Sequence, residues 1–247
     1  MIDDTPARAF LEGLAGELPQ RPDAIIIFSA HHDESVASIT SAAMPETIHD
    51  FGGFPAEMYD MRYGAPGAPA LADRIANMLG AAGIANRLDP VRGFDHGAWT
   101  PMMLAWPKAD IPIVQVSIDT RQSPEYHFNL GKALGSLRDE NILLIGSGAI
   151  THNLSAFFRG GFAADAPAER WVTDFLDWLG ERLQAGDTIA TLNAVEQAPH
   201  GRDNHPTMDH ILPLFVALGA GGPGAKATRL HTSVDHAVLA MDTWRFD

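Results

Sequence analysis

The chain of 247 residues is 46% hydrophobic and 19% charged, which is ordinary for a globular protein that can bury a sizeable core, and its length favours a single domain. The net charge of −14 argues against a nucleic acid or an anionic membrane surface as the partner. The chain has no cysteine, which excludes disulfides, thiolate metal sites and a cysteine nucleophile, so any metal must be held by His, Asp or Glu.

The first part of the chain predicts a helix, two strands and a long loop. The opening residues, MIDDTPARAF, lack the basic region and apolar stretch of a signal peptide, and no later segment approaches the ~20 apolar residues of a membrane span, so we expect a cytoplasmic protein. A helix is predicted over 4–18, with Thr5 as its cap. The unbroken apolar run in 24–30 predicts a buried strand, and 34–42 predicts a second one. The Gly/Pro/aromatic stretch 44–70 predicts a loop with at most a short helix.

Helices and strands continue to alternate along the rest of the chain. The predicted helices are 68–83, 123–140, 168–186 and 207–221, and the predicted strands are 111–119, 141–154 and two short ones within 228–247. The segment 93–101, GFDHGAWTP, indicates a Gly/aromatic turn, and 219–227 a flexible loop. This alternation predicts an α/β fold: a single-domain sandwich with a central mixed, largely parallel sheet flanked by helices.

The chain has 11 histidines, and many follow strands or lie in loops. These are His31, His32, His49, His96, His152, His205 and His210, whereas His127, His200, His231 and His236 are interpreted as structural or solvated. Strand ends and loops are the places from which side chains converge on a site. A site rich in histidine and free of cysteine suits zinc or ferrous iron, although each histidine taken alone fits a hydrogen-bonded structural residue better than a metal ligand.

Three common motifs are missing from the sequence. The stretch GSGAIT lacks the Lys-Ser/Thr ending of a P-loop, and no G-x-G-x-x-G pattern opens a helix after a strand. The turn at Ser147 also lacks the G-x-S-x-G pattern of a nucleophile elbow. We therefore expect Ser147 to shape the turn that presents His152.

Seven short segments together resemble one family. They are SAHHDE, TIHDFGGFP, YGAPGAPALA, GFDHGAWTPM, PIVQVSID, GSGAITHNL and HPTMDHILPL. In this order they resemble the class III extradiol ring-cleavage dioxygenases, in the branch similar to 4,5-DOPA extradiol dioxygenase, over nearly the whole chain. The resemblance implies a non-haem ferrous iron, with zinc often found in its place, and the opening of a catechol ring next to its two hydroxyls by molecular oxygen.

The resemblance also implies roles for particular residues. His31 and His210 match metal ligands, and His152 matches a residue close to the metal that serves as acid/base and in zinc forms also coordinates. His49 and His96 match positions that line the substrate pocket. His32 takes the place of a tryptophan common in the family, so no role is transferred to it.

One departure concerns the amino terminus. The family begins with a short strand and the motif His-Gly-Ser-Pro, whose histidine is a metal ligand, and this motif would precede Asp3. The resemblance therefore implies that residues 1–247 form a single extradiol dioxygenase-like catalytic domain without the family's first strand. A shortened version of a longer protein and a natural loss of the ligand are both open at this point.

The expected reaction is acid/base-assisted ring opening. The partners implied by the resemblance are an aromatic diol and O₂. His152 would take a phenolic proton and return it later. A zinc-dependent hydrolase on the same fold is one alternative, in which His152 would be the base. A non-catalytic relative that binds catechols or metal is another. The sequence does not fix the oligomeric state, so a homo-oligomer remains an open alternative.

Overall fold

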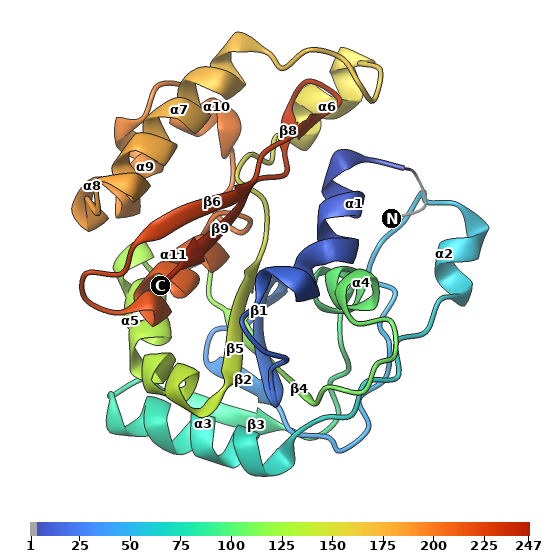
Figure 1. Ribbon diagram of the computed structural model, residues 1–247, viewed down its shortest axis with the longest axis vertical. Helices are drawn as coiled ribbons and strands as arrows, with labels where there is room; N and C mark the ends of the chain where they lie inside the picture. The colour runs from blue at the N-terminus through green and yellow to red at the C-terminus, as the bar shows by residue number, and fades with distance from the viewer. Residues whose placement is uncertain (1–3) are drawn as a thin grey trace.

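The centre of the protein is a five-stranded sheet. The structure is a computed structural model that describes residues 4–247, so the expected absence of a strand ahead of Asp3 concerns residues outside this range. The strands are β1 (Ala24–Asp33), β2 (Ala37–Thr40), β3 (Asn86–Asp89), β4 (Ile113–Ile118) and β5 (Ile142–Ser147). They lie in the order β3-β2-β4-β1-β5 (Figure 1), and all neighbours are parallel except β2 and β4. The predicted α/β fold with a mixed, largely parallel sheet is confirmed.

Helices cover both faces of this sheet. On one face lie α3 (Pro69–Ala81), α5 (Pro124–Leu134) and α11 (Leu212–Gly221), which share a buried core with Ile26 and Phe28 of β1. On the other face α4 (His96–Ala105) packs against Ile25 and Ile27, with α1 (Pro6–Gly13) beside it. Because side chains alternate along a strand, the face that carries residues 25 and 27 also carries Ser29 and His31. The strand therefore directs His31 toward α4.

A third group of elements packs on the far side of α11. Helix α7 (Arg170–Gln184) shares a core with the two-stranded ribbon of β6 (Ala227–His231) and β9 (Thr243–Phe246). The remaining short elements are α2 (Ala56–Asp60), α6 (Leu154–Gly160), α8 (Thr188–Leu192), α9 (Ala194–Gln197), α10 (Gly201–Asn204), β7 (Val234–Asp235), β8 (Leu239–Ala240) and the 3-10 helices Leu14–Glu17 and Gly135–Glu140. No helix between residues 4 and 247 has the length and apolar character needed to cross a membrane.

The predicted turn at 93–101 is wrong, because α4 begins inside it at His96. The Asp95 carboxylate caps the helix by accepting the N–H of Ala98. Pro101 has no N–H to offer the carbonyl of Gly97, the bond that a helix would normally make there. The hydroxyl of Ser147, at the end of β5, donates to that carbonyl instead, at 2.6 Å. The proline is thus tolerated because a neighbouring strand supplies the missing donor.

Other boundaries also differ from the prediction. The helix predicted over 207–221 begins only at Leu212, so His210 lies in the turn before it. The carboxyl-terminal tail forms parts of four short strands, where two were predicted. Strand β3 was not predicted, and it is short, half-exposed and polar. Short elements of this kind depend on tertiary pairing more than on their own sequence pattern.

Candidate active site

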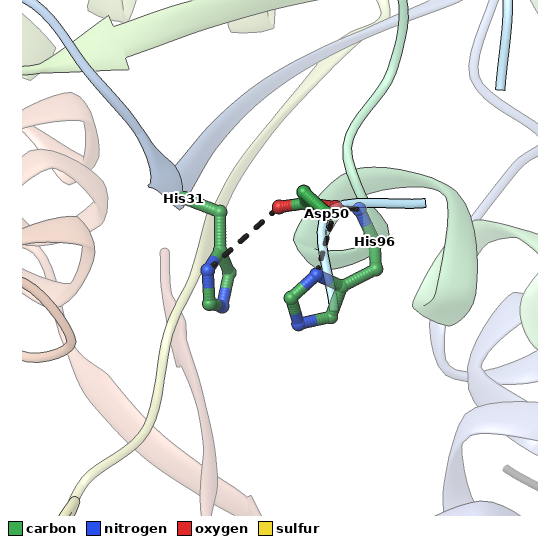
Figure 2. Close-up of side chains that lie close together, drawn as sticks. All are labelled: His31, Asp50 and His96. Atoms are coloured by element: carbon green, nitrogen blue, oxygen red, sulfur yellow. Dashed lines mark hydrogen bonds and ion pairs between the residues drawn. The ribbon is translucent and has the colours of Figure 1, made fainter. Parts of the chain in front are cut away.

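His31 and His96 meet where β1 approaches the first turn of α4. A Cβ atom added to Gly97 would lie 2.3 Å from Ser29 Oγ and 3.1 Å from His31 Cδ2, so this close approach requires glycine. The approach brings the rings of His31 and His96 to 3.9 Å between centroids. Figure 2 shows the two imidazoles side by side, one from the strand and one from the helix.

A buried carboxylate holds this junction in place. Asp95 accepts hydrogen bonds from Ser29 Oγ at 2.6 Å, from Arg92 at 3.1 Å and from the side-chain amide of Gln115. Arg92 also donates to the carbonyl of His31 at 3.3 Å. The network joins β1, β4 and α4, so the backbone that carries His31 is fixed from three directions.

His152 and His210 come from the opposite side of the site. A Cβ on Gly148 would lie 2.1 Å from the carbonyl oxygen of His210, and the N–H of Ala149 donates to the same oxygen at 2.9 Å. The turn after β5 is therefore packed directly on the backbone of His210. The N–H of His152 donates to the carbonyl of Asn204 at 2.9 Å. As a result the rings of His152 and His210 stack, with centroids 3.3 Å apart and planes 12° from parallel.

The two pairs join into one row of imidazoles. The rings of His31 and His210 lie 5.0 Å apart between centroids in an edge-to-face contact. A cavity of about 1240 Å³ opens beside them, lined by His31, His96 and His210 and by residues 142–147 of β5, the edge strand of the sheet. Four of the five histidines assigned to the site by the sequence are thus in one ring-to-ring chain.

The other histidines considered are set apart from this row. The fifth, His49, lies near the carbonyl of Met61, with Nε2 at 2.9 Å, and its ring packs on Phe51 and Trp99. Phe51 in turn contacts the ring of His96 at 5.5 Å. His32 is buried on the other face of β1 from His31. His49 is therefore one aromatic ring removed from the imidazole row.

Two groups within residues 4–247 offer three donor atoms that all lie within 4.8 Å of one another: His31, Asp50 and His96 on one side, and His152, Asp209 and His210 on the other. Burial and the neighbouring His96 and His210 rings lower the pKa of His31 to about 4. Burial and the adjacent His210 ring likewise lower the pKa of His152 to about 4. Both imidazoles are therefore neutral near pH 7, which is the form that binds a metal. Neutral imidazoles such as those of His31 and His152 suit zinc or a first-row transition metal such as ferrous iron.

Two carboxylates complete the site, and the sequence analysis gave neither of them a role. Asp209 Oδ2 lies 2.6 Å from Nδ1 of His210. Burial raises the pKa of Asp209, but the hydrogen bonds with His210 and Thr207 and the charges of the His210 and His152 rings together outweigh it and hold the pKa well below its ordinary value. An ionised acceptor at Nδ1 leaves Nε2 of His210 free for a ligand. Asp50 likewise lies at hydrogen-bond distance from Nδ1 of His96. The sequence places an acid next to a histidine at 49–50, 95–96 and 209–210. This adjacency was the available signal for a carboxylate–imidazole pair, but it does not show which imidazole each carboxylate contacts.

His205 is a structural residue that predicts a pH effect on stability. It is 2% exposed, and its Nε2 lies 2.7 Å from the carbonyl of Ile150. Burial lowers its pKa to about 4. As the pH falls, the unfolded chain takes up this proton first, so stability is full above pH ~6.5 and is lost between about pH 6.5 and 4. From the pKa difference, proton uptake by His205 in the unfolded chain should lower the free energy of unfolding by about 2 kcal/mol at about pH 5.

Urea denaturation of metal-free protein at several pH values checks this expectation. Between about pH 7.5 and pH 5, the free energy of unfolding of His205→Gln should fall by about 2 kcal/mol less than that of the wild type. Met44→Leu, at an exposed side chain that does not titrate, should keep the wild-type pH dependence. Equal pH dependence in all three proteins would contradict the assignment.

Comparison with known proteins agrees with this geometry. Residues 8–240 match the family described as the catalytic LigB subunit of aromatic ring-opening dioxygenase. The chain is 37% identical over 248 residues to a 4,5-DOPA dioxygenase extradiol of Beta vulgaris, with 99% of this chain and 91% of that protein covered. A protein of the same name from Escherichia coli K12 is 41% identical over 203 residues, covering 81% of this chain and 73% of that protein.

A solved structure shows the same fold. The crystal structure of an uncharacterised Escherichia coli K12 protein superposes with a TM-score of 0.79 and 31% identity, covering 99% of this chain and 93% of that one. The family match spans almost all of the chain, including the strand that carries His31 and the turn that carries His210. The chain therefore belongs to the LigB family of aromatic ring-opening dioxygenases and is an extradiol ring-cleaving oxidoreductase.

Proposed function

We propose that the protein opens a catechol-type aromatic ring with molecular oxygen, using a metal ion held by His31 and His210, with His152 beside it as the acid/base and as a further ligand when zinc is bound. The observation that carries the proposal is the convergence of these three side chains, from β1, from the loop after β5 and from the turn before α11, beside a large cavity. His31 and His152 supply neutral nitrogen donors, and Asp209 orients the ring of His210.

The metal we propose for activity is ferrous iron, with zinc as the ion that the isolated protein can carry. When bound, ferrous iron supplies the redox chemistry that oxygen activation requires. The protein's own contribution is a rigid set of donors, because backbone contacts at Gly97 and Gly148 fix the approach of the two halves of the site. Metal ligands need this rigidity, since donor distances must stay near about 2.0–2.1 Å.

The remaining histidines act on the substrate. We assign His152 the transfer of a proton from a substrate hydroxyl, because it is neutral near pH 7 and is held against His210. His96 lines the cavity and binds the substrate directly. His49 contributes to binding through the aromatic cluster that it forms with Phe51 and Trp99.

Oxygen uptake tests the proposed function. Iron-loaded protein is mixed with a series of catechols in an oxygen electrode, and products are analysed by mass spectrometry. We expect oxygen consumption and a product heavier than the catechol by both atoms of O₂. Ester hydrolysis by the zinc-loaded protein without oxygen uptake would favour a hydrolase instead. Binding of catechols without turnover in either metal form would show a non-catalytic relative.

A further inference from the structure

Asp50 is placed firmly beside the start of α4. The segment before it pairs with the segment before the helix: the N–H of Ile48 donates to the carbonyl of Phe94, and the N–H of Phe94 donates to the carbonyl of Glu46, both at 2.8 Å. The indole N–H of Trp99 donates to the carbonyl of Ile48 at 2.9 Å. Asp50 therefore sits in a long loop at a point where backbone bonds tie that loop to α4.

One carboxylate oxygen of Asp50 binds His96 twice. Oδ1 accepts the backbone N–H of His96 and lies at hydrogen-bond distance from its ring Nδ1, each at 2.9 Å (Figure 2). Two bonds from one residue to one oxygen fix both the position of the backbone and the rotation of the ring. An ionised carboxylate only accepts hydrogen bonds, so both N–H groups of His96 donate to Oδ1.

An ionised acceptor at Nδ1 selects one form of a neutral imidazole. The proton stays on Nδ1, and Nε2 keeps its lone pair. Because the ring of His96 lines the cavity, that nitrogen is placed to accept a hydrogen bond from a hydroxyl group there. Without Asp50, both the rotation of the ring and the position of its proton would be free to change.

We propose that Asp50 is a positioning residue that holds His96 in its Nδ1-protonated form, with Nε2 available to a hydroxyl group of the aromatic substrate. The substrate half of this inference rests on the proposed function. The half that concerns the imidazole does not, because it follows from the two hydrogen bonds. The second oxygen of Asp50 lies 3.9 Å from Nδ1 of His31, so the same carboxylate faces Nδ1 of both rings.

A metal-ligand role for Asp50 is the main competing outcome. His31, Asp50 and His96 offer donor atoms that all lie within 4.8 Å of one another, and two histidines with one carboxylate can bind ferrous iron. The hydrogen bonds favour positioning, because Oδ1 is already engaged by both N–H groups of His96. The test must therefore measure metal content as well as the state of the ring.

Nuclear magnetic resonance reports the form of the imidazole directly. Zinc-loaded protein labelled with ¹⁵N-histidine is studied by long-range proton–nitrogen correlation, and the His96 signals are identified by their loss in His96→Gln. The wild type should show the Nδ1-protonated form. Asp50→Ala should shift His96 toward the Nε2-protonated form, since alanine removes the acceptor, whereas the amide oxygen of Asp50→Asn can still accept both N–H groups of His96 and should preserve the Nδ1-protonated form. Asp60→Ala, at an exposed carboxylate in the same loop region, should leave the signals unchanged.

Kinetics and metal content complete the experiment. Asp50→Ala should keep the wild-type metal content and lower kcat with catechols by about 10–100-fold, with a much smaller change in KM. Added to His96→Gln it should cost little more, because the two residues act as a unit. An unchanged His96 spectrum, additive losses, or loss of metal in Asp50→Ala would each overturn the proposal. If the wild type turns over no catechol, the proposed function fails, while the spectrum still decides the role of Asp50.

Discussion

Replacing His152 with alanine should lower kcat for catechol cleavage by about 10²–10⁴-fold, the usual contribution of a positioned acid or base. Substrate affinity should change much less, because His96 and the cavity wall are left intact. The structure adds a reason for this expectation. The pKa of His152, lowered to about 4 by burial and by the His210 ring, leaves the imidazole unprotonated near pH 7, the form that can accept a proton.

The contacts around His152 indicate that His152→Ala keeps the structure of its loop. Thr151 is buried, and its hydroxyl donates to the carbonyl of Val238 at 2.8 Å. The backbone N–H of His152 donates to Asn204. Both bonds use atoms that the substitution leaves in place, so we expect the loop to keep its path. The loss should therefore come from the missing imidazole and not from local unfolding.

Single-turnover and steady-state rates of iron-loaded protein, with metal content measured on the same samples, check this prediction. His236→Ala, whose ring packs on Phe157 away from the imidazole row, is the matched control and should keep wild-type kcat. A His152→Ala protein that retains both metal and kcat would move the proton transfer elsewhere, with His96 as the next candidate. Loss of metal together with kcat would instead make His152 a ligand first.

The sheet and the direction of His31 could be predicted because they depend on local patterns. The apolar run from Ile25 to Phe28 marks a strand buried on both faces, and alternation along that strand places His31 on the α4 side. Helix α4 could not be predicted in the same way. Its proline, glycine and aromatic residues indicate a turn, and the bond that makes the helix acceptable comes from Ser147, fifty positions later in the chain.

The candidate site could likewise be predicted from the sequence only in part. That histidines at strand ends would gather could be argued from the sequence, and the structure brings His31, His96, His152 and His210 into contact. The roles of Asp50 and Asp209 could not, because a carboxylate acts on whichever ring the fold puts against it. Asp209 pairs with the ring of His210, the next residue in the chain. Asp50 pairs with the ring of His96, 46 positions away, and not with its neighbour His49.

Zinc should stabilise the wild type and fail to stabilise proteins that lack His31 or His210. A metal that binds only the folded state adds about 2.7 kcal/mol at 100 times its Kd. For a chain of this size each kcal/mol raises Tm by about 2–4 °C, so the expected shift is roughly 5–10 °C. His31→Ala and His210→Ala each remove a nitrogen donor from the imidazole row, and we expect the shift to disappear in both.

Asp209→Ala should give an intermediate result that a structural defect would not. The variant keeps every proposed ligand but frees Nδ1 of His210, and loss of such an orienting partner costs about 10–100-fold in metal affinity. At a zinc concentration of about 100 times the wild-type Kd, zinc should still stabilise Asp209→Ala by about 0.4–1.4 kcal/mol. Raising zinc further should restore the full shift in Asp209→Ala but not in His210→Ala.

Calorimetry of chelator-treated protein with and without added zinc gives these shifts, and elemental analysis gives the bound metal. His200→Ala, outside the imidazole row and half-exposed, should retain the complete wild-type shift. If His210→Ala still binds one zinc with an undiminished shift, the ligand set proposed here is wrong. The group of His31, Asp50 and His96 would then be the next set to test, because its donor atoms all lie within 4.8 Å of one another and both of its imidazoles line the cavity. In that case Asp50→Ala, and not Asp209→Ala, would abolish the response to zinc.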